Sequence, residues 1–238
     1  MKATNWEFKY RAVVIGLIIA FAFQFYSVDH QNVTAALANL LAPKFGLDPD
    51  RFARILFVLA AIPLIAAALL RTWASAYLRS EVVYAANIQT KSLVADGPYR
   101  HVRNPLYFGN FLMAIGLGAM TSRVGFFVLT LGMLWFCYRL ILREEAELGT
   151  VQGESYNRYR KAVPRFWPAL RARVPAGPGQ ANWAQGFKAE AWFWGFPAAV
   201  LAFAATLKNA LFFGIIGLSL ACFWLLNSKK ESQAGGQS

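Results

Sequence analysis

Long apolar stretches recur along the chain, and short polar segments separate them. A bilayer with a hydrocarbon core of about 30 Å needs about 20 helical residues to cross it, and each stretch is close to that length. Glycines within the third stretch should let helices pack closely there. The pattern predicts six membrane-spanning helices, at about residues 12–28, 54–74, 105–121, 124–142, 191–207 and 209–227.

The composition supports this interpretation, because 57% of the 238 residues are hydrophobic and only 15% are charged. Soluble domains carry about a quarter charged residues, so we expect an all-α, polytopic membrane protein. The net charge of +12 comes from residues between the apolar stretches, where juxtamembrane cations lie. We therefore expect no nucleic-acid partner. The two cysteines lie in apolar runs and the two histidines are scattered, so no metal site is expected.

The distribution of positive charge predicts the orientation of the helices. If the N-terminus is cytosolic, 19 of the 24 Lys and Arg residues fall on the cytosolic side. The positive-inside rule then places both chain ends in the cytosol. The membrane itself would be a bacterial inner membrane or the endoplasmic reticulum. The polar segments 75–104 and 143–188 would both face the cytosol. They should lie side by side, because the third and fourth stretches are joined by a tight turn at Ser122-Arg123.

The same pattern divides the chain into a membrane core and a C-terminal extension. The core is predicted at 1–173, and a Pro- and Gly-containing linker is predicted at 174–190. A transmembrane hairpin at 191–227 follows, and the polar tail at 228–238 is predicted to be disordered. Within the core, the apolar segment at 33–42 is expected to form a short interfacial helix.

A dense polar cluster lies directly before the third apolar stretch. Pro105 suits the first position of a helix, whose free N–H groups and positive dipole end could hold an anionic group. Taken singly, Arg100 and Arg103 could reach lipid headgroups, while Tyr99 and Tyr107 could belong to an interfacial aromatic belt. Their concentration within nine residues favours a binding site for a small polar molecule instead.

A second cluster follows the fourth apolar stretch, where four of the 12 acidic residues lie within 144–154. Pairs with arginine on a solvated helix face account for Glu147 and Glu154. Glu144 and Glu145 continue the helix as it leaves the hydrocarbon, so one should point into the bundle and one outward. A carboxylate at this depth usually faces a cavity and a partner.

The two clusters together resemble the family of membrane-embedded, S-adenosylmethionine-dependent methyltransferases, which includes isoprenylcysteine carboxyl methyltransferase and the phospholipid N-methyltransferases. The resemblance covers about residues 91–168, with two motifs in the usual order and spacing around a helical hairpin. The matching residues are Leu93-Val94, Gly97-Pro98-Tyr99-Arg100, Val102-Arg103, Pro105, Tyr107, Gly109, Arg143-Glu144-Glu145, Tyr156, Tyr159 and Val163-Pro164-Arg165-Phe166-Trp167-Pro168.

The resemblance implies a cytosol-facing pocket for S-adenosylmethionine above a helical membrane core, and a lipid or lipid-modified substrate. It also implies that Arg139 or Arg143 faces the substrate. By that resemblance, the cofactor-binding residues are Lys91, Leu93, Val94, Gly97, Tyr99, Arg103, Asn104, Pro105, Leu106, Tyr107 and Glu144.

The acceptor group decides which side chains the chemistry needs. A carboxylate is already ionised at pH 7 and needs only a cation such as Arg143 or Arg139 to hold it. An amine needs a proton acceptor, for which Glu144 or Glu145 is the candidate. The family commonly has His at the position of Asn104, and an amide does not titrate.

Carboxyl O-methylation of a lipidated or hydrophobic acid is therefore the first hypothesis. Phospholipid-type N-methylation is the second. A non-catalytic membrane scaffold that binds anionic lipid is the third, and it comes from a different functional class.

Overall fold

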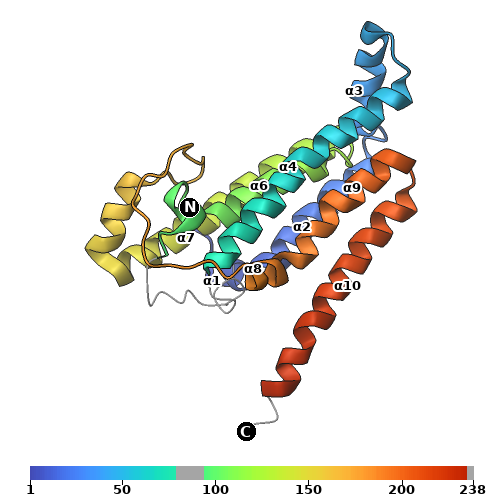
Figure 1. Cartoon of the computed structure of the whole chain (residues 1–238). Helices are drawn as coiled ribbons and strands as arrows, with labels where there is room; N and C mark the ends of the chain where they lie inside the picture. Colours follow the sequence, from blue (N-terminus) through green and yellow to red (C-terminus); the bar gives the residue numbers. More distant parts are fainter. Residues whose placement is uncertain (79–93, 235–238) are drawn as a thin grey trace.

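The computed structural model describes residues 1–78 and 94–234, with side chains up to residue 225 (Figure 1). This part of the chain is helical and contains no strand. The helices are α1 (Asn5–Lys9), α2 (Arg11–Gln24), α3 (Val33–Leu41), α4 (Pro49–Tyr77), α6 (Pro105–Gly118), α7 (Arg123–Ala162), α8 (Trp183–Glu190), α9 (Gly195–Thr206) and α10 (Asn209–Ala234).

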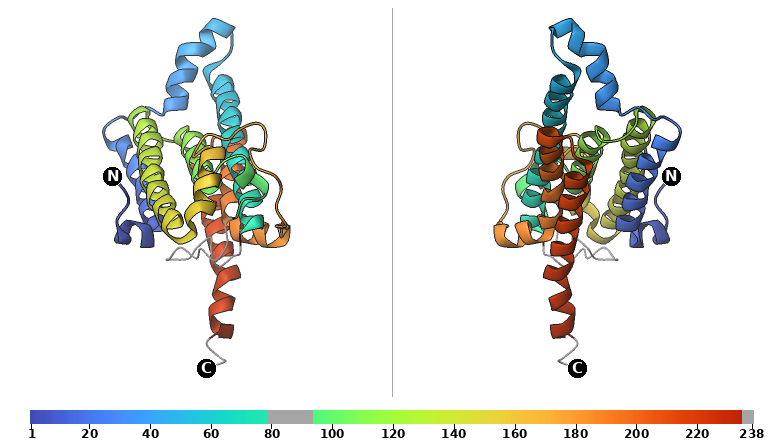
Figure 2. Two further views of the ribbon diagram at one scale, coloured as in Figure 1. Left: turned by 90° about the vertical axis from the view of Figure 1, so that its left-hand side faces the viewer. Right: turned by 90° about the vertical axis from the view of Figure 1, so that its right-hand side faces the viewer.

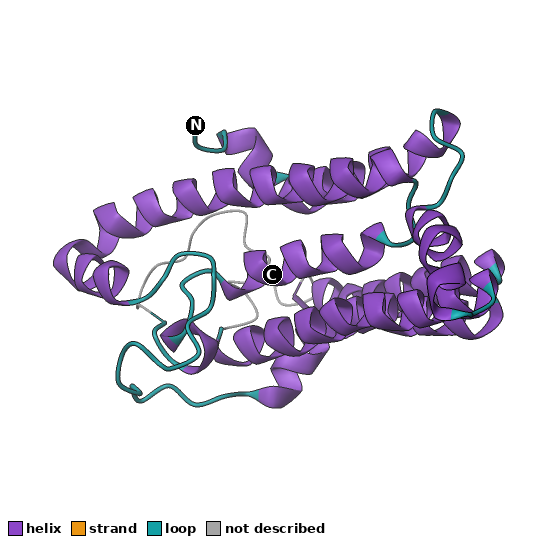
Figure 3. Ribbon diagram, turned by 90° about the horizontal axis from the view of Figure 1, so that it is seen from above, coloured by secondary structure: helices purple, strands orange, loops and turns teal. Residues whose placement is uncertain are grey.

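Five helices form the body of a bundle, in the spatial order α2, α7, α6, α4 and α9, and α10 packs on the outer side of α9. Figure 2 shows α10 extending beyond the bundle at one end, and α3 projecting with the start of α4 at the other. Loops gather at one end of the bundle, which is clear from above in Figure 3. The core between the helices is apolar, and Leu64, Met113, Leu117 and Met133 are fully buried in it.

Glycines allow α4 and α6 to approach closely, as the sequence predicts. A Cβ added to Gly116 would lie 2.6 Å from the carbonyl oxygen of Ala60 and 2.6 Å from Cγ of Leu64. On the side facing α7, a Cβ added to Gly118 would lie 2.7 Å from the ring of Phe126. Side chains larger than hydrogen would therefore force the helices apart.

A helix lies at each of the six apolar stretches, but their lengths differ. Among the described residues, α4 and α7 are long and apolar enough to cross a membrane by length and composition. Helix α4, with 29 residues, is about 43 Å long, whereas α6, with 14 residues, is about 21 Å. The number of crossings and the orientation of the chain stay predictions.

The structure differs from the sequence prediction in the C-terminal part of the chain. Helix α8 occupies the second half of the segment predicted as a linker, because Gly186 packs against the backbone of Thr72 and Ala76 on α4. The backbone of α10 continues to Ala234, into the predicted disordered tail. The predicted interfacial helix at 33–42 corresponds to α3.

Candidate active site

The two sequence motifs meet at the end of the bundle where α6 begins and α7 ends, on the left in Figure 1. Backbone hydrogen bonds join the short loop before α6 to the loop after α7. The N–H of Arg103 donates to the carbonyl of Pro164 at 2.9 Å, and the N–H of Ala169 donates to the carbonyl of His101 at 2.9 Å. The segments are thus held in a fixed register.

The turn at the start of the first motif also packs on α7. It forms a short 3-10 helix, Gly97–Arg100, in which Gly97 has φ 56 and leaves no room for a Cβ beside the ring of Tyr77. The hydroxyl of Tyr159 donates to the carbonyl of Tyr99 at 2.7 Å. Burial raises the pKa of Tyr99 well above its ordinary value, so this phenol stays protonated at neutral pH.

Glu145 is the centre of a buried polar cluster and is 5% exposed. Its Oε1 accepts from Asn104 Nδ2 at 3.2 Å and lies 3.2 Å from Nη1 of Arg103. Its Oε2 accepts from Nε of Arg165 at 3.0 Å. Asn104 Nδ2 also donates to the carbonyl of Arg165 at 3.0 Å, so the cluster ties both motifs together.

Glu144 also faces the first motif and accepts a hydrogen bond of 2.5 Å from the hydroxyl of Tyr107. The sequence predicts that only one of Glu144 and Glu145 points inward, and here the structure differs. Consecutive side chains on a helix lie about 100° apart. Glu144 reaches Tyr107 on α6, whereas Glu145 reaches Asn104 just before α6 and Arg165 in the loop after α7.

The two arginines predicted to face a substrate already have partners: Arg139 pairs with Glu7 near the N-terminus, and Arg143 pairs with Glu147 on the same helix. Arg139 holds both carboxylate oxygens of Glu7, with Nη2 donating to Oε2 at 2.9 Å. Arg143 pairs with Glu147 at 2.9 Å and lies over the ring of Phe8, 4.9 Å from its centroid. Helix α1 therefore covers this face of α7.

Glu7 is a residue that the motif search missed. Its carboxylate also accepts from the N–H of Thr4, and Thr4 in turn caps α1, which forms a capping box. This hydrogen bond and the interaction with Arg139 lower the pKa of Glu7. The Thr4-x-x-Glu7 spacing was a sequence signal for the helix start, though not for the contact with Arg139.

The remaining predicted cofactor-binding residues do not all lie in this polar cluster. Lys91 and Leu93 lie outside the described residues, and Val94 is half-buried at the edge of the described segment. Pro105 is buried at the first position of α6. The carbonyl of Leu106 accepts a hydrogen bond from Arg71 of α4, a residue that sequence reasoning did not place in the site.

Buried donors in the cluster leave capacity for an anionic ligand. The Arg103 side chain is 7% exposed, and its Nε has no hydrogen-bond partner among the described residues. Its Nη1 is close to Glu145, but without the geometry of a hydrogen bond. This donor, together with the free N–H groups in the first turn of α6, fits the carboxylate of an amino-acid-like cofactor.

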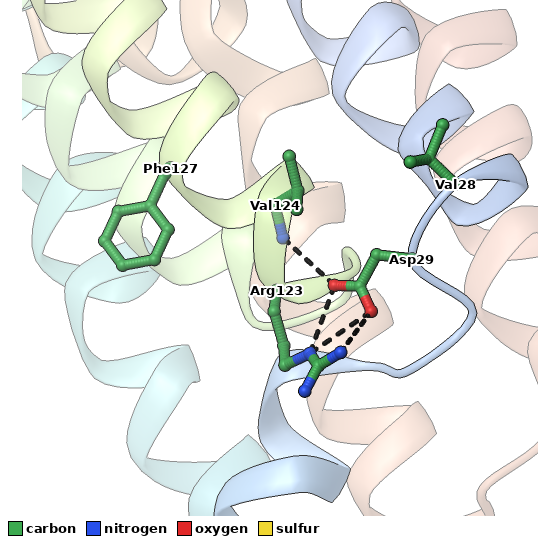
Figure 4. Close-up of a pocket in the computed structure, with 5 residues that line it drawn as sticks. All are labelled: Val28, Asp29, Arg123, Val124 and Phe127. Atoms are coloured by element: carbon green, nitrogen blue, oxygen red, sulfur yellow. Dashed lines mark hydrogen bonds and ion pairs between the residues drawn. The ribbon is translucent and has the colours of Figure 1, made fainter.

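A pocket of about 350 Å³ lies elsewhere, at the N-terminal end of α7, lined by Val28, Asp29, Arg123, Val124 and Phe127 (Figure 4). Asp29 accepts from the guanidinium of Arg123 and from the N–H of Val124, next to Ser122, which caps this end of α7. Glu144 is 21 residues farther along α7, about 31 Å away along the helix axis. The pocket therefore belongs to the other end of the bundle.

Comparison with known proteins finds a family match that includes α6 and most of α7. Residues 55–153 match the family model described as phospholipid methyltransferase. The family resemblance is confirmed over this segment. It includes the whole of α6 and the part of α7 that carries Glu144 and Glu145, whereas Arg165 and the C-terminal helices lie outside it. No solved structure matches the chain.

Three curated relatives match parts of the chain. It is 39% identical over 95 residues to the protein-S-isoprenylcysteine O-methyltransferase of Schizosaccharomyces pombe, which covers 38% of this chain and 39% of that protein. It is 31% identical over 88 residues to the nickel-cobalt-cadmium resistance protein NccN of Alcaligenes xylosoxydans xylosoxydans, covering 37% and 41%. It is 26% identical over 151 residues to the cobalt-zinc-cadmium resistance protein CzcN of Cupriavidus metallidurans, covering 63% and 65%.

The chain thus spans between about two fifths and two thirds of the length of these relatives. The family match and the S. pombe relative support a membrane methyltransferase. The metal-resistance names describe two distant relatives. The described part of this chain contains no group of three or more His, Cys, Asp or Glu side chains that could hold a metal ion.

Proposed function

We propose that the protein is an integral-membrane, S-adenosylmethionine-dependent methyltransferase that O-methylates the carboxyl group of a lipidated or hydrophobic acid. The observation that carries the proposal is the joining of two motifs, far apart in the sequence, into one polar unit. Tyr107 binds Glu144, and Asn104 binds Glu145, across the α6–α7 hairpin. A structural scaffold would not need one buried and one half-buried carboxylate at the end of an apolar bundle.

The cofactor supplies an electrophilic methyl carbon on a sulfonium, which becomes a neutral thioether when the methyl group moves to a carboxylate oxygen. In this chain, Arg103 and the first turn of α6 would hold the anionic end of the cofactor. Glu144, oriented by Tyr107, would face its cationic part. The remaining predicted contacts would come from Gly97, Tyr99 and the segment 91–94.

The contacts of the acidic and basic residues favour a carboxylate acceptor over an amine. Two N–H groups of Arg139 donate to the two carboxylate oxygens of Glu7. The carboxylate of an acid substrate could be bound by the same pair of donors. Glu145 is engaged by two arginines, and Glu144 already accepts a hydrogen bond from Tyr107. Neither carboxylate is therefore well placed to accept a proton from an amine.

Phospholipid-type N-methylation is the second candidate, because the matching family model is described as phospholipid methyltransferase. In either case we propose that the apolar part of the substrate enters laterally between the helices and that the cofactor arrives from the cytosol. The exposed apolar side chains on α7, such as Phe127, Leu131 and Trp135, suit contact with lipid acyl chains.

Two measurements test the proposal. Detergent-purified protein titrated with S-adenosylhomocysteine should bind it saturably, and Glu144→Gln should weaken this binding while expression stays normal. Absence of saturable binding up to millimolar ligand would favour the scaffold. Membranes incubated with radiolabelled S-adenosylmethionine should incorporate base-labile label, as an ester does, whereas base-stable label would indicate N-methylation.

A further inference from the structure

The C-terminal part of the chain, outside the segment that matches the family, buries a carboxylate inside the helical bundle. Glu190, at the end of α8, is fully buried. Its Oε2 accepts from Nε of Arg71 at 2.8 Å, and its Oε1 accepts from the hydroxyl of Ser75 at 2.7 Å. A buried carboxylate with both oxygens satisfied from α4 is a costly feature that a simple packing contact does not need.

Arg71 carries the connection on from Glu190 to α6. Its Nη1 donates to Oδ1 of Asn110 at 2.7 Å and to the carbonyl of Leu106 at 3.2 Å. Its guanidinium also lies 4.8 Å from the ring centroid of Phe193, which follows Glu190 closely in the chain. One guanidinium thus contacts both the C-terminal segment and the first two turns of α6.

The contacted turn is the part of α6 that carries the proposed cofactor site. Leu106 lies between Pro105 and Tyr107, and the Tyr107 hydroxyl binds Glu144. Gly109 lies against Arg71, since an added Cβ would be 2.6 Å from its Cγ. A shift of Arg71 would therefore move the backbone of the first turn of α6 directly.

We propose that Glu190 and Arg71 are positioning residues. Through the carbonyl of Leu106 and the side chain of Asn110, they fix the start of α6, and with it Asn104 and Tyr107, in the geometry that the cofactor needs. The inference rests on the proposed function for its catalytic meaning. It assigns to α8 and the following helix η4 (Ala191–Trp194) the task of completing a site built by residues far upstream.

Arg54 provides a matched control, because a variant there should affect the packing of the C-terminal segment but not the start of α6. Arg54 also attaches α4 to the C-terminal segment, by donating to the carbonyls of Ala204 and Ala205 at the end of α9. Arg54 lies 17 residues before Arg71 on α4, about 25 Å away along the helix. Arg54→Gln therefore loosens the same attachment without touching α6.

The test compares Glu190→Gln with Arg54→Gln in detergent-purified full-length protein. Hydrogen exchange of the α6 amides, the melting temperature and the affinity for S-adenosylhomocysteine are measured for each. Glu190→Gln should speed exchange in α6 and weaken ligand binding by about tenfold or more, since the loss of one hydrogen bond to a charged ligand group costs about that factor or more. Arg54→Gln should lower the melting temperature and change neither the exchange nor the affinity. Ser75→Ala, which leaves no unpaired charge, should give a smaller change in the same direction if Glu190→Gln does not fold.

Two results would overturn the inference. Glu190→Gln, or Ser75→Ala in its place, could lower the melting temperature while exchange in α6 stays at the wild-type level. Alternatively, Arg54→Gln could change exchange and affinity as much as the Glu190 variant. If the wild-type protein binds no S-adenosylhomocysteine, the proposed function fails, and the exchange comparison alone decides whether Glu190 positions α6.

Discussion

Removal of Glu145 should destabilise the protein far more than removal of its neighbour Glu147, although both are glutamates on α7 paired with arginine. Glu145 is 5% exposed and lies between the guanidinium groups of Arg103 and Arg165. The side chain of Glu147 is 39% exposed and makes one pair with Arg143, four residues earlier on the same helix. The change Glu→Ala is thus the same, and only the surroundings differ.

The magnitudes follow from these surroundings. Removing one partner of a buried ion pair costs about 3–5 kcal/mol, because the remaining charge stays buried without compensation. Arg103, with a side chain 7% exposed, is in this situation, whereas Arg165 is 35% exposed and can be hydrated. We therefore expect Glu145→Ala to cost about 3 kcal/mol, near the lower end of that range. An exposed pair four residues apart contributes about 0.3–0.5 kcal/mol, so Glu147→Ala should cost no more than that.

The assay is reversible unfolding of both variants in mixed micelles, with the free energy of unfolding taken from the denaturant midpoint and slope. The double variant Arg103→Met/Glu145→Leu should regain most of the lost stability, since an apolar pair of similar size replaces the ion pair. It should nevertheless bind S-adenosylhomocysteine poorly. A loss below about 1 kcal/mol for Glu145→Ala, or equal losses for the two single variants, would refute the reasoning about burial.

Three further changes test other parts of the structure. Gly116→Ala should cost about 1–3 kcal/mol in the same unfolding assay, because the carbonyl of Ala60 cannot move without shifting α4. Glu7→Gln should lower the KM for a hydrophobic acid substrate at unchanged kcat, because it weakens the carboxylate that occupies Arg139. The hydrogen bond from Arg123 lowers the pKa of Asp29 to about 2. The contribution of Asp29 to stability should therefore be complete above about pH 4 and should be lost as the pH falls towards 2.

Each of these changes has a control and a contradicting result. Gly16→Ala, with nothing within 4 Å of the added Cβ, should not destabilise α2, and equal losses at both glycines would exclude helix crowding as the cause. An unchanged KM in Glu7→Gln would remove Arg139 from the acceptor site. Asp29→Asn should reduce the fall in melting temperature between about pH 4 and pH 2, and a variant that keeps the full fall would place the titration elsewhere.

The contact between the two motifs could be predicted from the sequence, because it depends on local rules. Pro105 sets where α6 begins, the short turn at Ser122-Arg123 forces a hairpin, and the hairpin brings Tyr107 opposite Glu144. The same rules left the partners of Glu145 open, since Arg165 reaches it from a loop whose path no periodicity specifies.

The connection through Arg71 could not be predicted in this way. Arg71 lies near the end of the predicted span at 54–74, and the structure buries its side chain between α6 and the C-terminal segment. Its partner Glu190 lies 119 residues away in a segment without any recognisable motif. The packing of α8 against α4, permitted by Gly186, brings the two charges together.

Asn104 shows how one departure from the family pattern bears on the chemistry. Its amide NH₂ donates to Glu145 and to the carbonyl of Arg165 at once, and each of these bonds joins the start of α6 to the second motif. A neutral histidine ring has one N–H donor and could make only one of the two bonds. Asn104 thus joins the two motifs by two hydrogen bonds, where a neutral histidine would make one. Unlike histidine, however, its amide cannot accept or release a proton at neutral pH. A carboxylate acceptor, which is ionised at neutral pH, needs no such transfer, and this residue therefore favours O-methylation over N-methylation.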